Sequence, residues 1–227
     1  MCDSPAAPLS SLLNILPQAQ ALGRCELTVY EAGSGPLAEI YMSRLRWLTL
    51  TLSGVGPDIA IPLFATPNLT TLCIHSHGKW ALNTYDILKR HRKLHQLQRI
   101  ELNNGFYPLR IAQVLADAPM IHELLVTDRS ILDAEALEGI ASGRLGHHLS
   151  SLRLSGYFTP ALAGECLDMI ESRQRLVNAL VTHVPNWRQM LTGIRLVELR
   201  GIRNISRDYE ERAAALKALG STVTFCQ

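Results

Sequence analysis

Strong charge bias, long hydrophobic runs and leader-like segments are missing from this chain of 227 residues. Its 22 basic and 20 acidic residues give a formal net charge of +2, far below the basic excess that draws a domain to nucleic acid or anionic lipid. No run of about 18 apolar residues occurs, and residues 1–20 lack the basic start and apolar core of a signal peptide. The sequence predicts a cytoplasmic or nuclear protein with neither a nucleic-acid nor a membrane partner.

The chain also lacks a disulfide pattern. Its five cysteines are odd in number and far apart in the sequence, at Cys2, Cys25, Cys73, Cys166 and Cys226. Scattered thiols of this kind are typical of buried cysteines in a reducing compartment.

Motifs of catalysis are absent as well. The segment "GSGP" at residues 33–36 lacks the Lys and Ser/Thr of a phosphate-binding loop and indicates a turn. Asp168 and Glu171 lie close on a predicted helix, but helix surfaces produce such carboxylate pairs routinely. The sequence predicts a protein that is not an enzyme, and the open alternative is an enzyme whose site one sequence does not display.

The histidines raise a metal hypothesis, which their pattern does not support. Cys73, His75 and His77 alternate along one predicted strand, and His91 and His95 are spaced i, i+4 on a predicted helix. Neither set has a further ligand to complete it, and the pair His147 and His148 has none either. We therefore expect no metal and no cofactor, and we interpret the basic run "KRHRKLH" at 89–95 as a solvent-facing helix surface.

What the sequence does contain is one short phrase, aliphatic-x-x-aliphatic-x-aliphatic, written six times. Chance produces several such hexamers in a chain this rich in Leu, Ile and Val, so the spacing carries the prediction. The middle anchors are 24, 28, 24, 28 and 45 residues apart, and 26 more residues reach Val223. These anchors are Leu48, Leu72, Ile100, Leu124, Leu152 and Val197.

All steps but one match a leucine-rich repeat, which places one strand in every 20 to 29 residues or so. The segment "CELTVY" indicates a first strand through Leu27 and Val29. Leu27 precedes Leu48 by 21 residues. The segments between phrases have helical periodicity, with predicted helices in residues 107–119, 159–173 and 206–219. The sequence thus predicts an α/β leucine-rich-repeat solenoid, horseshoe-like, with a curved parallel sheet on the concave face and helices on the convex face.

We expect a single domain over residues 1–227. It comprises an N-terminal cap at 1–24, regular repeats at 25–173, an insertion at 174–192, and the last repeats with a C-terminal cap at 193–227. The insertion accounts for the 45-residue step by extending the preceding helix and adding a loop. The alternative, a degenerate repeat with its anchor at Ala179, would leave only 18 residues before Val197.

The candidate binding site follows from strand geometry, because residues between the aliphatic anchors project from the opposite side of the sheet. On a concave face this row offers an aromatic anchor and charged pairs to a protein or peptide target. The predicted partner-binding residues are Trp47, Thr49, Cys73, His75, Arg99, Glu101, Asn103, Glu123, Arg153, Glu198 and Arg200.

Five segments carry a resemblance to a known family: "LRWLTLTLSG", "LQRIELNN", "LSSLRLSGYF" followed by "CLDMIESR", and "AALKALGSTVTF". They span most of residues 25–227 and resemble the leucine-rich-repeat region of fungal F-box-like domain-containing proteins. The resemblance implies target recognition by the repeats, while an N-terminal F-box docks a ubiquitin-ligase adaptor. Residues 1–24 show no F-box, so we expect such an adaptor only through an F-box outside this sequence or through another chain. A truncated F-box-like relic without activity is a further alternative.

Overall fold

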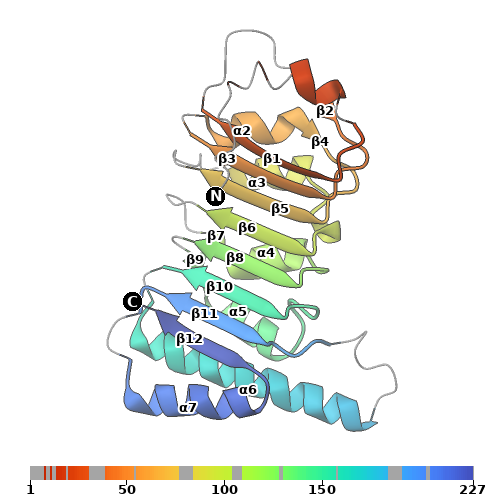
Figure 1. Cartoon of the computed structure of the whole chain (residues 1–227). Coiled ribbons are helices and arrows are strands. Elements are labelled where there is room, and N and C mark those ends of the chain that lie inside the picture. Colours follow the sequence, from red (N-terminus) through yellow and green to blue (C-terminus); the bar gives the residue numbers. More distant parts are fainter. Residues whose placement is uncertain are drawn as a thin grey trace. The chain divides into compact units, whose positions relative to one another are not determined.

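The protein is a mixed α/β chain whose eight long strands pair in parallel (Figure 1). The computed structural model describes residues 8, 11, 14–18, 20–30, 39–53, 55–76, 84–103, 109–127, 130–156, 158–183, 191–202 and 205–226. The chain divides into two compact units, residues 1–107 and residues 108–227.

The first unit pairs its long strands in the order β1-β3-β5-β6, which is also their order along the chain. These strands are β1 (Arg24–Val29), β3 (Trp47–Leu52), β5 (Thr71–Ser76) and β6 (Arg99–Asn103). A short parallel pair joins β2 (Ile40–Tyr41) to β4 (Phe64–Ala65). Figure 1 shows the helices behind the long strands; the helical elements of this unit are η1 (Leu16–Gln18), α2 (Pro57–Ala60), η2 (Ile61–Leu63), α3 (Thr84–His91) and η3 (Leu94–Gln96).

The second unit repeats the arrangement with strands in the order β8-β10-β11-β12. They are β8 (Glu123–Thr127), β10 (Ser151–Ser155), β11 (Leu196–Arg200) and β12 (Thr222–Cys226). The short strands β7 (Leu109–Arg110) and β9 (Ser130–Ile131) pair with each other. The helices are α4 (Ile111–Asp117), α5 (Ala134–Ala141), α6 (Pro160–His183) and α7 (Arg207–Ala218).

The predicted aliphatic anchors lie side by side in each unit, which confirms the strand spacing. In the first unit Leu48 is in register with Leu72 and Leu72 with Ile100. The second unit aligns four anchors in the same way: Leu124, Leu152, Val197 and Val223. All of them except Val223 are at most 1% exposed. Each buried anchor contributes roughly 1.5 to 3 kcal/mol relative to exposure, so the rows form the core of both units.

The first strand exists as predicted, but its alignment is wrong by two residues. Cys25 is the partner of Leu48, and Leu27 is the partner of Leu50. A shift of two residues leaves every side chain on the same face of the sheet, so the alternation of apolar residues does not distinguish the two registers.

The predicted helices are confirmed, and the one predicted at residues 159–173 extends further along the chain. Thr159 precedes α6, and its Oγ1 accepts a hydrogen bond from the backbone N–H of Leu162 at 3.3 Å. The helix then continues to His183, so the first ten residues of the predicted insertion extend it, as expected. Ala179 is helical, which contradicts the alternative of a degenerate repeat anchored there; residues 184–190 of the predicted insertion lie outside the described residues.

A buried arginine ties α6 to the segments around it. Arg173 is 0% exposed, and burial lowers its pKa to about 10. Its guanidinium donates to the carbonyl oxygens of Ile140, Gly146, His147 and Thr192 at 2.8 to 3.0 Å. These carbonyls belong to the last turn of α5, to the segment after it and to the approach to β11, so one side chain supplies hydrogen bonds that several buried backbone groups require.

The core assignment is tested by a pair of neighbouring substitutions on β8. Leu124→Asp places a carboxylate at a site that is 1% exposed, so we expect unfolding to become easier by more than about 3 kcal/mol. Leu125→Asp is the matched control, because Leu125 is only half-buried and faces the other side of the strand. Urea unfolding of both variants measures the difference, and an equal loss would contradict the assignment of the two faces.

A second pair on α6 tests the buried guanidinium. Arg173→Ala leaves four carbonyls without their donor, and we expect a loss of about 3 to 5 kcal/mol in the free energy of unfolding. Arg175→Ala removes the same charge from a side chain that is 79% exposed and should change stability by less than about 0.5 kcal/mol. Denaturant unfolding curves measure the two losses of stability. Similar curves for the two variants would show that the hydrogen bonds of Arg173 to these carbonyls do not stabilise the fold.

Candidate binding surfaces on the open sheet face

Each unit has one sheet face that packs on helices and one that does not. The buried anchors point to the first, and the residues between them point to the second, which we call the open face. Figure 1 views this face, and none of the described helices crosses in front of the strands. The predicted partner-binding residues all lie on strands at open-face positions.

On the open face of the first unit, one tryptophan lies between two arginines. Strand register places Arg24 beside Trp47 and Thr71 beside Arg99, in one row across four strands. The guanidinium carbons of Arg24 and Arg99 lie 4.3 and 5.5 Å from the centre of the Trp47 ring, within the range of a cation–π interaction. The Trp47 Nε1 donates to Thr49 Oγ1 at 3.0 Å, so the half-buried ring is held in one orientation.

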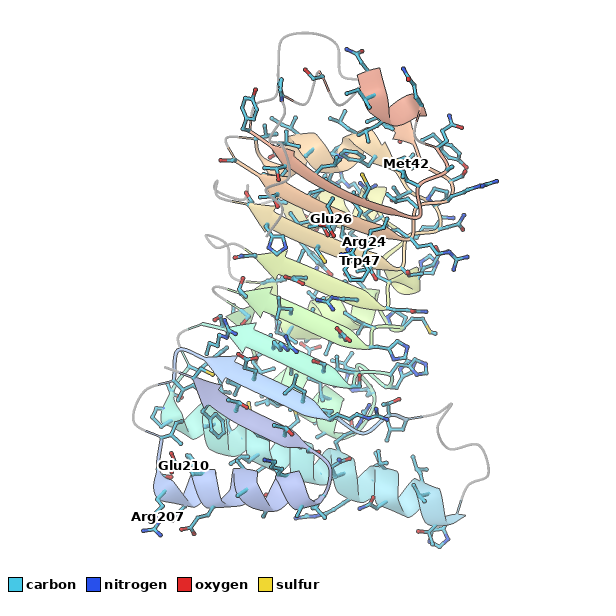
Figure 2. The ribbon with its side chains drawn as sticks, viewed as in Figure 1. Arg24, Glu26, Met42, Trp47, Arg207 and Glu210 are labelled. Carbon is cyan, nitrogen blue, oxygen red and sulfur yellow. The ribbon has the colours of Figure 1, made fainter. Side chains whose placement is uncertain are left out.

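Each of these arginines also pairs with a glutamate two residues along its own strand. Arg24 Nε donates to Glu26 Oε1 at 2.9 Å, and Arg99 Nη2 donates to Glu101 Oε2 at 2.9 Å. His75 Nε2 lies 3.5 Å from Glu101 Oε1. Figure 2 shows Arg24, Glu26 and Trp47 together on this side of the strands. We call this set the Trp47 surface; it consists of Arg24, Glu26, Trp47, His75, Arg99 and Glu101.

Cys73 lies beneath this surface and is only 3% exposed. Its Sγ is 3.7 Å from Glu101 Oε2. The pKa of Cys73 is raised to about 11, first by burial and then by the negative charge of Glu101. The thiol is therefore protonated at neutral pH, which makes it a poor nucleophile and a poor metal ligand.

The open face of the second unit carries a smaller charged group on β10 and β11, which we call the Glu198 surface: Arg153, Glu198 and Arg200. Arg200 Nε donates to Glu198 Oε1 at 2.6 Å, and Arg153 Nε lies 3.8 Å from Glu198 Oε2. Both arginines are about half exposed, so each pair is expected to add less than about 1 kcal/mol to stability.

The structure thus brings most predicted site residues into two groups. Thr49 and Cys73 join the Trp47 surface at its base, whereas Asn103 lies at the exposed end of β6, in register with His75. Glu123 begins β8 and is in register with Ser151.

Arg24 and Glu26 belong to the Trp47 surface but were absent from the predicted site. The signal that identifies them is the repeated Arg-x-Glu pattern, present in "RCE" at 24–26 and in "RIE" at 99–101. Aligning these two triplets also aligns their strands correctly, because Cys25 and Ile100 are then both anchors.

The basic run at 89–95 faces solvent at Lys89, Arg90, Lys93 and His95, as expected, but Arg92 is an exception and the run is not one helix. Arg92 is only 5% exposed, and its guanidinium donates to the carbonyl oxygens of Phe64 and Ile61, the latter at 2.6 Å. Helix α3 ends at His91 and His95 lies in η3, so these two histidines do not share one helix. The short segment between them turns Arg92 inward, where it donates to backbone carbonyls of η2 and β4.

Within the described residues, no group of three or more His, Cys, Asp or Glu side chains is arranged to hold a metal ion. His77 and the side chain of His91 lie outside the described residues. The rings of His122, His147 and His148 gather at the start of β10, with ring centres 4.5 and 5.6 Å from His148. Burial lowers the pKa of His148, and its histidine neighbours and Arg173 lower it further.

Comparison with protein-family models, curated proteins and solved structures returned no match. The resemblance to F-box-like proteins accordingly stays a prediction. Among the described helices, none is both long enough and apolar enough to cross a membrane.

The electrostatic coupling of Cys73 to Glu101 has a measurable consequence. Removing the carboxylate charge with Glu101→Gln takes away one cause of the raised pKa, so the pKa of Cys73 should fall and its thiolate fraction at pH 8 should rise. We expect iodoacetamide to alkylate Cys73 severalfold faster, read by mass spectrometry of the Cys73 peptide. Glu26→Gln is the control and should leave this rate unchanged; equal rates in all three proteins would refute the coupling.

Proposed function

We propose that this chain is a non-enzymatic recognition module that binds a protein or peptide through the Trp47 surface. The observation that carries the proposal is an aromatic side chain held between two arginines on a sheet face that no described helix covers. Trp and Arg are the residues most enriched among those that dominate binding energy at protein interfaces.

The rigidity of the tryptophan favours binding. Its ring contacts Arg24 and Arg99, and its Nε1 is hydrogen-bonded to Thr49, so little side-chain freedom remains to be lost when a partner packs on it. Trp47 is nevertheless half-buried rather than buried, which leaves part of the ring accessible.

The charges of the surface favour a partner with side chains of both signs. Arg24 is 62% exposed and Glu26 is 46% exposed, so the pair between them adds little to the stability of the fold. Groups of this kind serve better to select and orient a partner than to hold the protein together.

The repeat pattern supports the wider proposal of a leucine-rich-repeat solenoid with a horseshoe-like curve. Steps of 24 to 28 residues and in-register parallel strands are found in both units, and the 45-residue step contains a lengthened helix. Proteins built this way present extended concave surfaces to their partners. We further propose that the protein acts in the cytoplasm or nucleus as a target-recognition module related to F-box-like proteins, with any ubiquitin-ligase adaptor docking elsewhere.

The test is a quantitative affinity capture from the native cell with four versions of the protein. Trp47→Ala removes the anchor, and the double change Arg99→Glu with Glu101→Arg reverses the charges while keeping a pair on β6. Arg44→Glu is the matched control, because Arg44 is exposed in the same unit but lies outside the Trp47 surface. All four must first melt alike.

We expect a partner that the wild type and Arg44→Glu enrich to the same extent, and that the two surface variants lose by tenfold or so, as loss of about 1.4 kcal/mol implies. Ubiquitin-ligase subunits among the captured proteins would support the F-box-like role, and their absence would count against it. Identical captures by all four versions would show that the Trp47 surface is not the binding site.

A further inference from the structure

The last strand of the second unit, β12, has one paired edge and one open edge among the described residues. On its paired side, the N–H of Thr222 donates to Arg195 and the carbonyl of Cys226 accepts from Gly201, at 2.7 and 2.8 Å. Backbone groups alternate in direction along a strand, so residues 222, 224 and 226 face β11. The N–H and C=O groups of Val223 and Phe225 therefore face outward.

The helix side of this edge is apolar and incompletely covered. Val223 and Phe225 are in register with Val197 and Leu199, which are 1% and 0% exposed. Val223 and Phe225 themselves, in contrast, are only half-buried. Beside them a groove of about 540 Å³ separates β12 from α7, and its walls include Ile202, Ile205, Glu210, Ala213, Ala214 and Lys217.

Nothing within β12 discourages pairing with another strand. Natural sheets protect open edges with lysine, proline, bulges or charged side chains, and the sequence "TVTFC" contains no proline or charged residue. The first strand of the first unit, β1, differs in this respect. Its Cys25 and Val29 are buried, and its open face carries the charges of Arg24 and Glu26.

We propose that β12 pairs antiparallel with β12 of a second copy of this chain, about a two-fold axis at Thr224. In this register Val223 lies opposite Phe225 of the second copy, and Phe225 lies opposite its Val223. Residues with outward backbone groups then lie directly opposite each other. Each such pair exchanges two backbone hydrogen bonds, as in the hydrogen-bonded pairs of an antiparallel ladder. A slip of one residue in either direction places the outward groups of one copy opposite inward-facing groups of the other, so the backbone excludes those registers.

Charge complementarity supports a second copy as the occupant. A two-fold axis perpendicular to the sheet keeps the same faces aligned and brings α7 beside α7 of the other copy, running the opposite way. Glu210 and Lys217 are exposed and both line the groove, and they lie seven residues apart, toward opposite ends of α7. Glu210 of each copy is thereby directed toward Lys217 of the other, while Val223, Phe225, Ala213 and Ala214 become buried.

The register is tested by cross-linking. Thr222 lies opposite Cys226 of the second copy in a non-hydrogen-bonded pair, where the Cα atoms are about 4.5 Å apart and within disulfide range. Thr222→Cys treated with oxidised glutathione should therefore form a covalent dimer of about twice 25.1 kDa on a non-reducing gel. The wild type and Thr182→Cys, an exposed position on α6, are the controls.

The charge pairs are tested by sedimentation equilibrium of the full chain. Glu210→Lys and Lys217→Glu should each raise the dimer dissociation constant by about tenfold, because two symmetric pairs become repulsive. The double variant should restore the wild-type constant, which a folding defect would not do. A wild type that is monomeric up to its solubility limit, cross-linking no faster than in the controls, or a double variant that stays weakened would each overturn the proposal.

Discussion

The fold depends on aliphatic anchors that bury one another across neighbouring strands. Leu72 is in register with Leu48 on one side and Ile100 on the other, and Leu152 lies likewise between Leu124 and Val197. A parallel strand gains its hydrogen bonds from the strands beside it, and its anchors are covered by those strands together with the helices on the same face. Stability in each unit is therefore shared between neighbouring strands and is not a property of any single strand.

Two buried arginines extend this dependence to the turns. Arg92 donates to carbonyls 28 and 31 residues earlier in the chain, and Arg173 donates to carbonyls 26 to 33 residues earlier as well as to Thr192. Turns between strands and helices leave carbonyl groups without partners, and a guanidinium satisfies several of them at once. The cost of burying its charge is visible in the lowered pKa of both side chains.

Burial of the anchors leaves two different kinds of surface exposed. The Trp47 surface offers side chains, an aromatic ring and ion pairs, on the open face of the sheet. The β12 edge offers backbone groups and an apolar groove instead. Recognition by the first depends on the partner's side chains, whereas recognition by the second depends on its ability to form a strand. The two proposed interactions use separate atoms, so one protein is able to support both.

The amino-acid sequence by itself determined the eight long strands, their order and the length of each step, because the period-2 anchors and their spacing are local properties of the chain. It also placed Trp47, Arg99 and Glu101 on one face. The alternation of apolar residues allowed either Cys25 or Leu27 to lie opposite Leu48, since both registers present the same face, and the pairing of β1 with β3 selects Cys25. Only the tertiary structure decided the burial of Arg92 and Arg173, which depends on carbonyls contributed by distant turns, and the contact of Arg24 with Trp47, which exists only once β1 and β3 are paired.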